Sequence, residues 1–275
     1  MIADTPQPGF LSRLEAYCRS LCEANWQDPG GPLRLNRDLS SADVQNASFF
    51  QNTRQFLLAL QEQKGTAGTA TGNLNRVFVR HMLDRVALSP LQRQTILEVN
   101  KVINEQDLWA LHLSRVVSQS AGLVARRSGL FKVTSLGAAL LSDGRAGELY
   151  HTLFITYFRK FNLHYDFHLR DVPGIQQSMA AILWRLAEVT KDWRSVQGLA
   201  PQILLPRVLK QLHEAMVTQY DKEEWILSGY VLQPLLDFGL IGRRPKSDWH
   251  AITEEDSIRI TTLWMKFISF SPFTG

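Results

Sequence analysis

The chain has 275 residues, of which 45% are hydrophobic and 20% are charged, and its formal net charge is +4. This composition excludes a largely disordered chain, because the apolar surface is large enough to offset the entropy lost on folding. With 17 glycines and only two cysteines, it also excludes a collagen-like protein and a disulfide-rich scaffold.

Residues 1–47 are expected to form a peripheral segment. Apolar residues recur with helical spacing from Phe10 to Leu21, which predicts one short amphipathic helix. The Gly- and Pro-rich residues 28–32 then end that helix. A second helix is predicted from Phe49 to about Gly65, and the small polar residues 66–73 are expected to be a linker.

Three helices and a β-hairpin are predicted in the next part of the chain. The helices are expected at 74–87, 90–103 and 107–121. Ser89 is a good N-cap because Pro90 suits the first helical position, and Asn104 or Asp107 can cap the third helix. Gly122 ends this helix, and two short apolar runs around a Ser-Gly turn then predict a hairpin over residues 123–133.

The clearest helical pattern lies in the middle of the chain. Six apolar residues fall on one wide stripe, which predicts a central core helix: Tyr150, Leu153, Phe154, Tyr157, Phe158 and Phe161. This helix belongs to a predicted helical linker region over residues 146–200. Further helices are expected near 203–219 and 223–238.

A short pattern occurs twice in the chain. Residues 122–127 are Gly-Leu-Val-Ala-Arg-Arg, and residues 239–244 are Gly-Leu-Ile-Gly-Arg-Arg. A second part, basic-aliphatic-Thr-x-Leu, follows in both copies, at residues 132–136 and 259–263. Each copy follows a predicted helix and leads into a helix capped by Thr. The pattern therefore predicts a degenerate internal repeat.

The order helix, Gly stop, strand, turn and strand resembles the last part of a winged helix-turn-helix domain. The resemblance implies a mainly α protein with short β-hairpin wings, in which tandem winged-helix-like modules are joined by aromatic-rich helices. The expected modules are residues 48–145 and residues 201–275, with the peripheral segment before the first and the helical linker region between them.

Three short stretches resemble an uncharacterised group of bacterial proteins, some of which are linked to plasmid open reading frames. They are Thr71-Gly72-Asn73-Leu74, Gly147-Glu148-Leu149-Tyr150 and Phe158-Arg159-Lys160-Phe161-Asn162. The resemblance extends over about residues 48–270. It implies no established activity and no catalytic residues, and likeness of fold alone does not define a function.

The first module coincides with the positive part of the chain. Residues 76–133 contain nine basic and four acidic residues, a net charge of +5, and such a surface attracts phosphate. In a winged helix, the helix before the wing can enter the major groove while the wing contacts the backbone. The resemblance therefore implies a set of nucleic-acid-binding residues: Arg76, Arg80 and Arg93 as phosphate contacts, His112, Arg115, Ser118 and Gln119 on the presumed recognition helix, and Arg126, Arg127 and Lys132 on the wing.

Acidic residues limit this hypothesis. Glu105 and Asp107 are expected at the N-terminus of the presumed recognition helix, where they suit the helix dipole but repel phosphate. In the second module, residues 221–224 are Asp-Lys-Glu-Glu, which favours packing against a neighbour or a protein partner. The first hypothesis is thus a DNA-associated regulatory or accessory protein. The alternative is a protein-interaction or scaffold protein, with a protein partner or as a homodimer, and with no DNA binding or catalysis.

The chain shows no recognisable catalytic motif. His164 and His168 flank a carboxylate at helical spacing, and His151 is a candidate third metal ligand, but two partly exposed histidines at a helix end explain the same pattern. We find no nucleophile elbow, phosphate-binding loop or dinucleotide fingerprint. We therefore expect no enzyme activity, cofactor or metal.

The location of the protein is predicted from two absent patterns. The N-terminal residues lack a basic stretch followed by an apolar run, so no signal peptide is expected. No apolar run approaches the roughly 20 residues that cross a membrane. We expect a cytoplasmic protein without a membrane partner.

Overall fold

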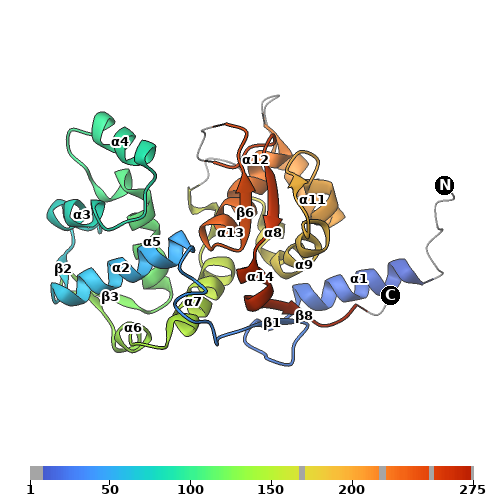
Figure 1. The fold of residues 1–275 in the computed structure, drawn as a ribbon, viewed down its shortest axis with the longest axis horizontal. Helices are drawn as coiled ribbons and strands as arrows, with labels where there is room; N and C mark the ends of the chain where they lie inside the picture. Colours follow the sequence, from blue (N-terminus) through green and yellow to red (C-terminus); the bar gives the residue numbers. More distant parts are fainter. Residues whose placement is uncertain (1–8, 167–170, 217–220, 248–250, 274–275) are drawn as a thin grey trace. The chain divides into compact units, whose positions relative to one another are not determined.

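A computed structural model describes residues 9–166, 171–216, 221–247 and 251–273 (Figure 1). The chain divides into two compact units, which we describe separately. Unit 1 comprises residues 1–36, 163–236 and 240–275, and unit 2 comprises residues 37–162 and 237–239. Both units are mainly helical, with short antiparallel strands in sheets of two or three. The predicted fold class, mainly α with short β-hairpins, is confirmed.

Unit 2 contains one three-stranded sheet, in the order β2-β4-β3. Its elements in chain order are α2 (Ser48–Glu62), β2 (Thr66–Ala67), α3 (Arg76–Leu83), α4 (Pro90–Val99), η1 (Glu105–Asp107), α5 (Trp109–Ser120), β3 (Val124–Arg127), β4 (Leu130–Val133), α6 (Ser135–Leu140), α7 (Ala146–Ile155) and η2 (Thr156–Lys160).

Side-chain caps place the helix starts of unit 2 near where the sequence predicts them. The Asn75 side chain accepts a hydrogen bond from the Phe78 amide and starts α3. Ser89 forms a capping box with Gln92, and Pro90 is the first residue of α4. Asn104 caps the short 3-10 turn η1, so α5 begins a little later than expected. Caps satisfy amides that have no partner inside the helix, which is why these signals are dependable.

The predicted core helix of unit 2 is confirmed. All six residues of the apolar stripe are buried along α7 and the π-helical turn η2 that extends it. Phe238, from the short piece 237–239, packs among the aromatic rings of this helix, and the Tyr150 hydroxyl donates to its carbonyl oxygen at 2.7 Å. A residue far away in the sequence thus completes the core of unit 2.

Unit 1 contains a three-stranded sheet, in the order β5-β7-β6, and the two-stranded sheet β1-β8. Its elements in chain order are α1 (Phe10–Cys22), β1 (Leu33–Leu35), η3 (Leu163–Asp166), α8 (Pro173–Gln177), α9 (Met179–Val189), β5 (Arg194–Ser195), α10 (Ala200–Ile203), α11 (Pro206–Ala215), α12 (Glu223–Leu227), η4 (Ser228–Leu232), α13 (Gln233–Asp237), β6 (Ile241–Arg244), β7 (Ser257–Ile260), α14 (Thr262–Phe267) and β8 (Ile268–Phe270).

The internal repeat predicted from the sequence is confirmed and is larger than expected. In each copy a helix, a short strand, further helices and a hairpin follow one another, and the short strand pairs with the second strand of the hairpin. The hairpins share one register, because Val124 lies opposite Val133 as Ile241 lies opposite Ile260. The strands β2 and β5 were not predicted, since two residues carry almost no periodic signal.

The start and the end of each hairpin also match. Gly122 and Gly239 both have positive φ angles, +73° and +70°, which only glycine adopts easily. The hydroxyls of Thr134 and Thr261 then start the next helix, by accepting from an amide three residues later. The Gly and Thr of the repeated pattern therefore have defined structural roles.

The units divide the chain differently from the expected modules. The expected linker region 146–200 is split, because α7 belongs to unit 2 whereas α9 and β5 belong to unit 1. The second copy of the repeat starts at α9 rather than at residue 201. Among the described residues, no helix has both the length and the apolar character that crossing a membrane requires.

Candidate nucleic-acid interface

The β3–β4 hairpin has an inner and an outer face. Because side chains alternate along a strand, Arg126 shares its face with the fully buried Phe131, whereas Arg127 and Lys132 lie on the opposite, outer face. Both outer residues are exposed, and Leu130 beside them is 39% exposed. Within the described part of the chain, neither Arg127 nor Lys132 forms an ion pair. The outer face therefore offers two uncompensated cations.

Arg126 has a partly structural role. Its Nη2 donates to the Thr69 carbonyl oxygen at 2.9 Å, and its guanidinium carbon lies 5.6 Å from the centre of the Phe131 ring. These contacts attach the segment after β2 to the hairpin. The residue is nevertheless exposed overall, so its remaining donors can reach an anion.

The three arginines of α3 and α4 differ in availability. Arg76 and Arg80 are exposed and lie one turn apart on α3, although Arg76 donates to the Asn104 side chain at 3.0 Å. Arg93 donates to the Asp84 carboxylate at 2.8 Å and to the Leu83 carbonyl oxygen. Because its charge is compensated, Arg93 is the weakest phosphate-binding candidate of the three.

Three residues proposed for the recognition helix lie in the interior instead. His112, Arg115 and Ser118 are 2%, 8% and 0% exposed. Arg115 donates from Nε to Glu105 and from Nη1 to Gln119, both at 2.5 Å, and the ring of His112 contacts the same carboxylate at 2.7 Å. These contacts correct the prediction of an accessible polar face, because the side chains are used to satisfy a buried carboxylate.

Glu105, which was expected to repel phosphate at the N-terminus of the recognition helix, is the centre of this buried cluster. It is 1% exposed, and it also accepts from the Leu74 amide. Burial raises the pKa of this carboxyl group, but the hydrogen bonds from His112, Leu74 and Arg115 outweigh burial and lower the pKa below its ordinary value. One sequence signal could have indicated that these residues lie together. His112 follows Glu105 by seven residues and Arg115 follows His112 by three, and residues at these spacings share one face of a helix.

The remaining surface of α5 is mostly apolar. Its half-exposed positions include Trp109, Leu113 and Val116, and Gln119 is held by Arg115. Few polar groups of α5 are therefore free to recognise base edges, which requires hydrogen-bond donors and acceptors. The exposed cations among the predicted binding residues lie on the hairpin and on α3.

The second hairpin is stabilised by a buried carboxylate. Asp256 is fully buried and accepts from Arg243 Nε at 2.8 Å, from the Thr253 amide at 2.8 Å and from the Lys246 amide at 2.9 Å. Burial raises the pKa of Asp256, but these hydrogen bonds outweigh it and lower the pKa. Arg243 occupies the register position that Arg126 has in the first hairpin.

Replacing Asp256 with Asn should destabilise unit 1 by about 2 kcal/mol, because the half-buried Arg243 loses its counter-charge and one buried acceptor becomes a donor. Urea denaturation followed by circular dichroism measures this loss. Glu255→Gln, a neighbouring exposed change, should alter the midpoint little. A midpoint for Asp256→Asn equal to that of Glu255→Gln would contradict the proposed role of the carboxylate.

The acidic start of α12 is internally paired. Glu223 contacts His213 Nε2 at 2.5 Å, and Glu224 accepts from the Gly198 amide at 3.0 Å. Lys222 pairs with Glu254. Carboxylates in the first helical turn also suit the helix dipole. This end of α12 is therefore a poor surface for phosphate, as its sequence suggested.

The candidate metal ligands do not form a described site. His164 lies in the 3-10 turn η3, where its Nδ1 is 2.9 Å from the Tyr230 hydroxyl, and His151 is buried in unit 2. His168 lies outside the described residues. Among the residues that the structure describes, no group of three or more His, Cys, Asp or Glu side chains is placed to hold a metal ion.

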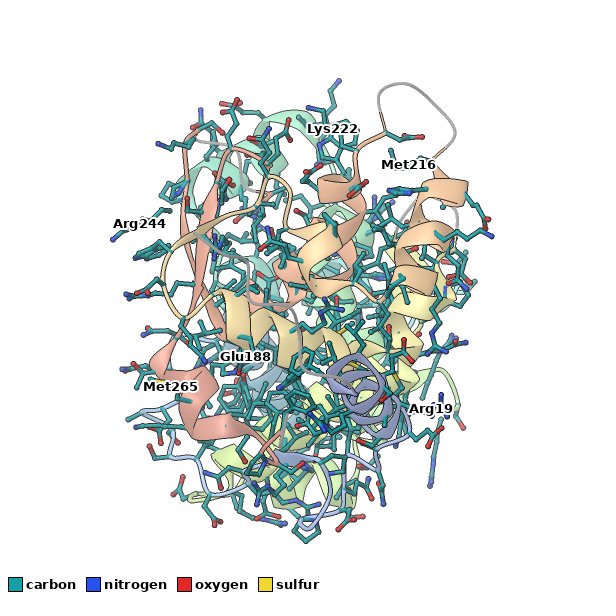
Figure 2. The ribbon with its side chains drawn as sticks, turned by 90° about the vertical axis from the view of Figure 1, so that its right-hand side faces the viewer. Arg19, Glu188, Met216, Lys222, Arg244 and Met265 are labelled. Carbon is teal, nitrogen blue, oxygen red and sulfur yellow. The ribbon has the colours of Figure 1, made fainter. Side chains whose placement is uncertain are left out.

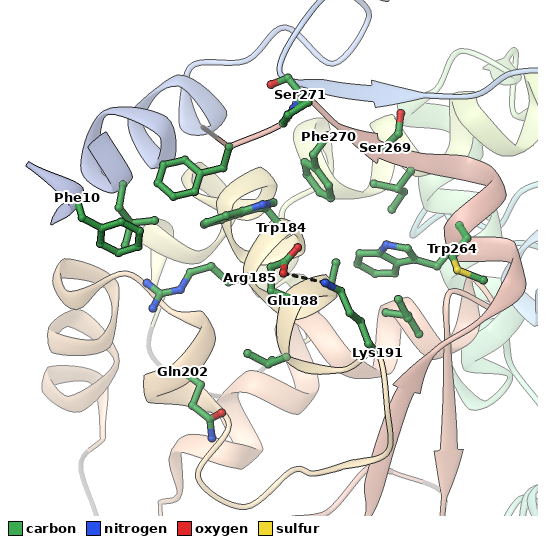
Figure 3. Close-up of a pocket in the computed structure, with 18 residues that line it drawn as sticks. Phe10, Trp184, Arg185, Glu188, Lys191, Gln202, Trp264, Ser269, Phe270 and Ser271 are labelled. Atoms are coloured by element: carbon green, nitrogen blue, oxygen red, sulfur yellow. Dashed lines mark hydrogen bonds and ion pairs between the residues drawn. The ribbon is translucent and has the colours of Figure 1, made fainter. Parts of the chain in front are cut away.

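Unit 1 also has an open groove of about 860 Å³, bordered by α1, α9 and the C-terminal residues (Figure 3). Aromatic rings form much of its wall, including those of Phe10, Trp184, Trp264 and Phe270. The exposed ion pair between Glu188 and Lys191, at 2.9 Å, lies beside it. The groove is chiefly apolar and contributes no second cationic surface.

Comparison with known proteins identifies one similarity. Residues 45–146 match an uncharacterised family described as the Y4jL N-terminal domain. The matched region contains the first copy of the repeat, from α2 through α6. No curated protein and no solved structure matches the chain. The match supports a resemblance to an uncharacterised family and carries no activity.

Proposed function

We propose that the chain is a DNA-associated accessory or regulatory protein that binds duplex nucleic acid through the first copy of the repeat. The observation that carries the proposal is the exposed cation pair Arg127 and Lys132 on the outer face of the β3–β4 hairpin, which forms no ion pair with any described residue. Arg126, Arg76 and Arg80 add further donors. Cations in this arrangement bind phosphates of the nucleic-acid backbone.

The topology supports interpreting each copy as a winged-helix-like module. The short strand between the first two helices pairs with the second strand of the hairpin, which gives the orders β2-β4-β3 and β5-β7-β6. The hairpin then corresponds to the wing, and α5 corresponds to the recognition helix. Because His112, Arg115 and Ser118 are buried, we propose backbone contact by the wing without base recognition by α5.

Fluorescence anisotropy with a random-sequence duplex, titrated at several salt concentrations, tests the proposal. The variant Arg127→Ala/Lys132→Ala should bind more weakly, and the slope of log K against log salt should become shallower by about 1.8, since each lost phosphate contact removes about 0.9. The control Lys101→Ala/Lys160→Ala removes the same charge from exposed positions of unit 2 outside the hairpin. Absence of binding by the wild type at low salt would contradict the proposal.

A specific observation favours self-association as a second candidate function. Helix α4 has no buried residue, and Leu91, Leu97 and Val99 are 49%, 46% and 73% exposed. Val77 on α3 is 83% exposed. Exposed aliphatic groups of this size suit a protein interface, here a homodimer. Sedimentation analysis of wild type and Leu91→Glu/Val99→Glu tests it, and a wild-type monomer at all concentrations would contradict it.

A further inference from the structure

The second hairpin repeats the cation pair of the first. Arg244 and Arg259 occupy in β6 and β7 the register positions of Arg127 and Lys132. Both are exposed, and Figure 2 shows Arg244 at the outer side of its hairpin. Their cross-strand neighbours on this face are the small residues Ser257 and Gly242.

An indole ring organises these two arginines. The guanidinium carbons of Arg244 and Arg259 lie 4.1 Å and 5.0 Å from the centre of the Trp193 ring. Trp193 directly precedes β5 and lies against Gly242, where a Cβ atom would be 3.6 Å from the indole. The first copy has no such ring, because Gly65 stands at the equivalent position before β2.

This arrangement leaves the hydrogen-bonding groups of both arginines available. Stacking on an aromatic ring uses the face of the guanidinium, whereas its N–H donors lie in the plane and point outward. It also restricts two long side chains that would otherwise lose rotamer freedom on binding. Two cations held beside one ring repel each other, and an anion that accepts from both removes that repulsion.

Two nearby carboxylates are engaged elsewhere, whereas Asp192 and Glu255 are exposed. Asp256 is buried against Arg243, and Glu254 pairs with Lys222. Within the described residues, neither Arg244 nor Arg259 forms an ion pair. Arg194 on β5 is also exposed, and it donates to the Val189 carbonyl oxygen at 3.3 Å.

We infer that Arg244, Trp193 and Arg259 form a second binding site, for the phosphodiester backbone of nucleic acid. The inference rests on the proposed function and extends it to the second copy of the repeat. The acidic sequence at the start of α12 had favoured a protein partner for this copy. Each guanidinium donates to phosphate oxygens, and Trp193 holds the two side chains in position. The two copies then bind the same class of ligand through equivalent hairpin positions.

The test is duplex binding by the full chain, with anisotropy measured over a salt series. Arg244→Ala/Arg259→Ala should reduce affinity several-fold at low salt, and its salt slope should be shallower by about 1.8, the loss expected for two phosphate contacts. Arg13→Ala/Arg19→Ala, which removes the same charge from exposed positions of α1 in the same unit, should retain the wild-type slope. Circular dichroism and thermal unfolding establish that each variant is folded.

A charge-preserving variant tests the contribution of the stack. Arg244→Lys/Arg259→Lys should keep most of the salt slope but bind more weakly than wild type, because lysine lacks the guanidinium group that lies over the Trp193 ring and donates several hydrogen bonds. Wild-type affinity in this variant would overturn the role of the indole. Inorganic phosphate at constant ionic strength is the second arm, and it should not displace the duplex. Displacement by phosphate would assign the site to small anions and overturn the inference.

The outcomes separate this inference from the proposed function. If Arg127→Ala/Lys132→Ala changes the slope and Arg244→Ala/Arg259→Ala matches its control, the second site is overturned and the proposed function stands. If only the second-hairpin variant changes the slope, binding through the first copy is overturned. Absence of wild-type binding at low salt overturns both.

Discussion

Replacing Glu105 with Ala should destabilise unit 2 by about 3–5 kcal/mol, which is typical when one partner of a buried ion pair is removed. The change leaves the Arg115 guanidinium buried, with its Nε donor unpaired. It also removes the acceptor of the Leu74 amide and the partner of His112. Both consequences act in the same direction, because buried polar groups without partners cost free energy.

Urea denaturation followed by circular dichroism measures this effect as a lower midpoint. The matched control is Glu98→Ala, which removes an exposed carboxylate that contacts Gln94. Surface changes of that kind usually shift stability by less than about 0.5 kcal/mol. Equal midpoints for the two variants would show that Glu105 does not hold the cluster together.

Acidification should lower the stability of unit 2 between about pH 6.5 and pH 4, through His151. Burial, with Arg37 nearby, lowers the pKa of His151 from 6.5 to about 4. The unfolded chain therefore binds a proton in this range while the folded chain does not, so stability falls as the pH falls. The shift corresponds to about 3 kcal/mol in total, since one pKa unit is about 1.4 kcal/mol.

His151→Gln should flatten this pH dependence, because its side chain stays neutral over the whole range. The measurement is the free energy of unfolding at a series of pH values for both proteins. Glu105 and Asp256 act at lower pH, because their pKa values are already below the ordinary 4.5 and 3.8 and their contributions are lost only under more acidic conditions. A variant with the same slope as wild type between pH 6 and pH 5 would contradict the role of His151.

The two hairpins show why the exposed cations were predictable from sequence. Alternation along a strand and a Ser-Gly turn placed Arg127 and Lys132 on a hairpin, and the structure puts both on its outer face. The same pattern predicted Arg244 in the second copy. The contact of Trp193 with Arg244 and Arg259 was not predicted, because it depends on the pairing of β5 with β7, which brings residues far apart in sequence together.

The helix α5 shows the opposite outcome. His112, Arg115 and Ser118 are polar, so their sequence indicated an exposed face, yet they pack inward. Burial of a charged residue depends on whether a partner of opposite charge reaches the same place. That partner is Glu105, which the 3-10 turn η1 directs into the interior. No local sequence pattern predicts that Glu105 contacts Arg115 and His112 in the interior.

The sequence by itself determined the mainly helical class, the helix starts at Ser89 and Thr134, the aromatic core helix and the internal repeat. These features depend on caps, turns and periodicity, which act between residues close together in the chain. Only the tertiary structure decided which polar side chains are buried, where Phe238 packs, and how β2 and β5 complete their sheets. Those outcomes arise from contacts between residues far apart in sequence, whose free energies no local pattern contains.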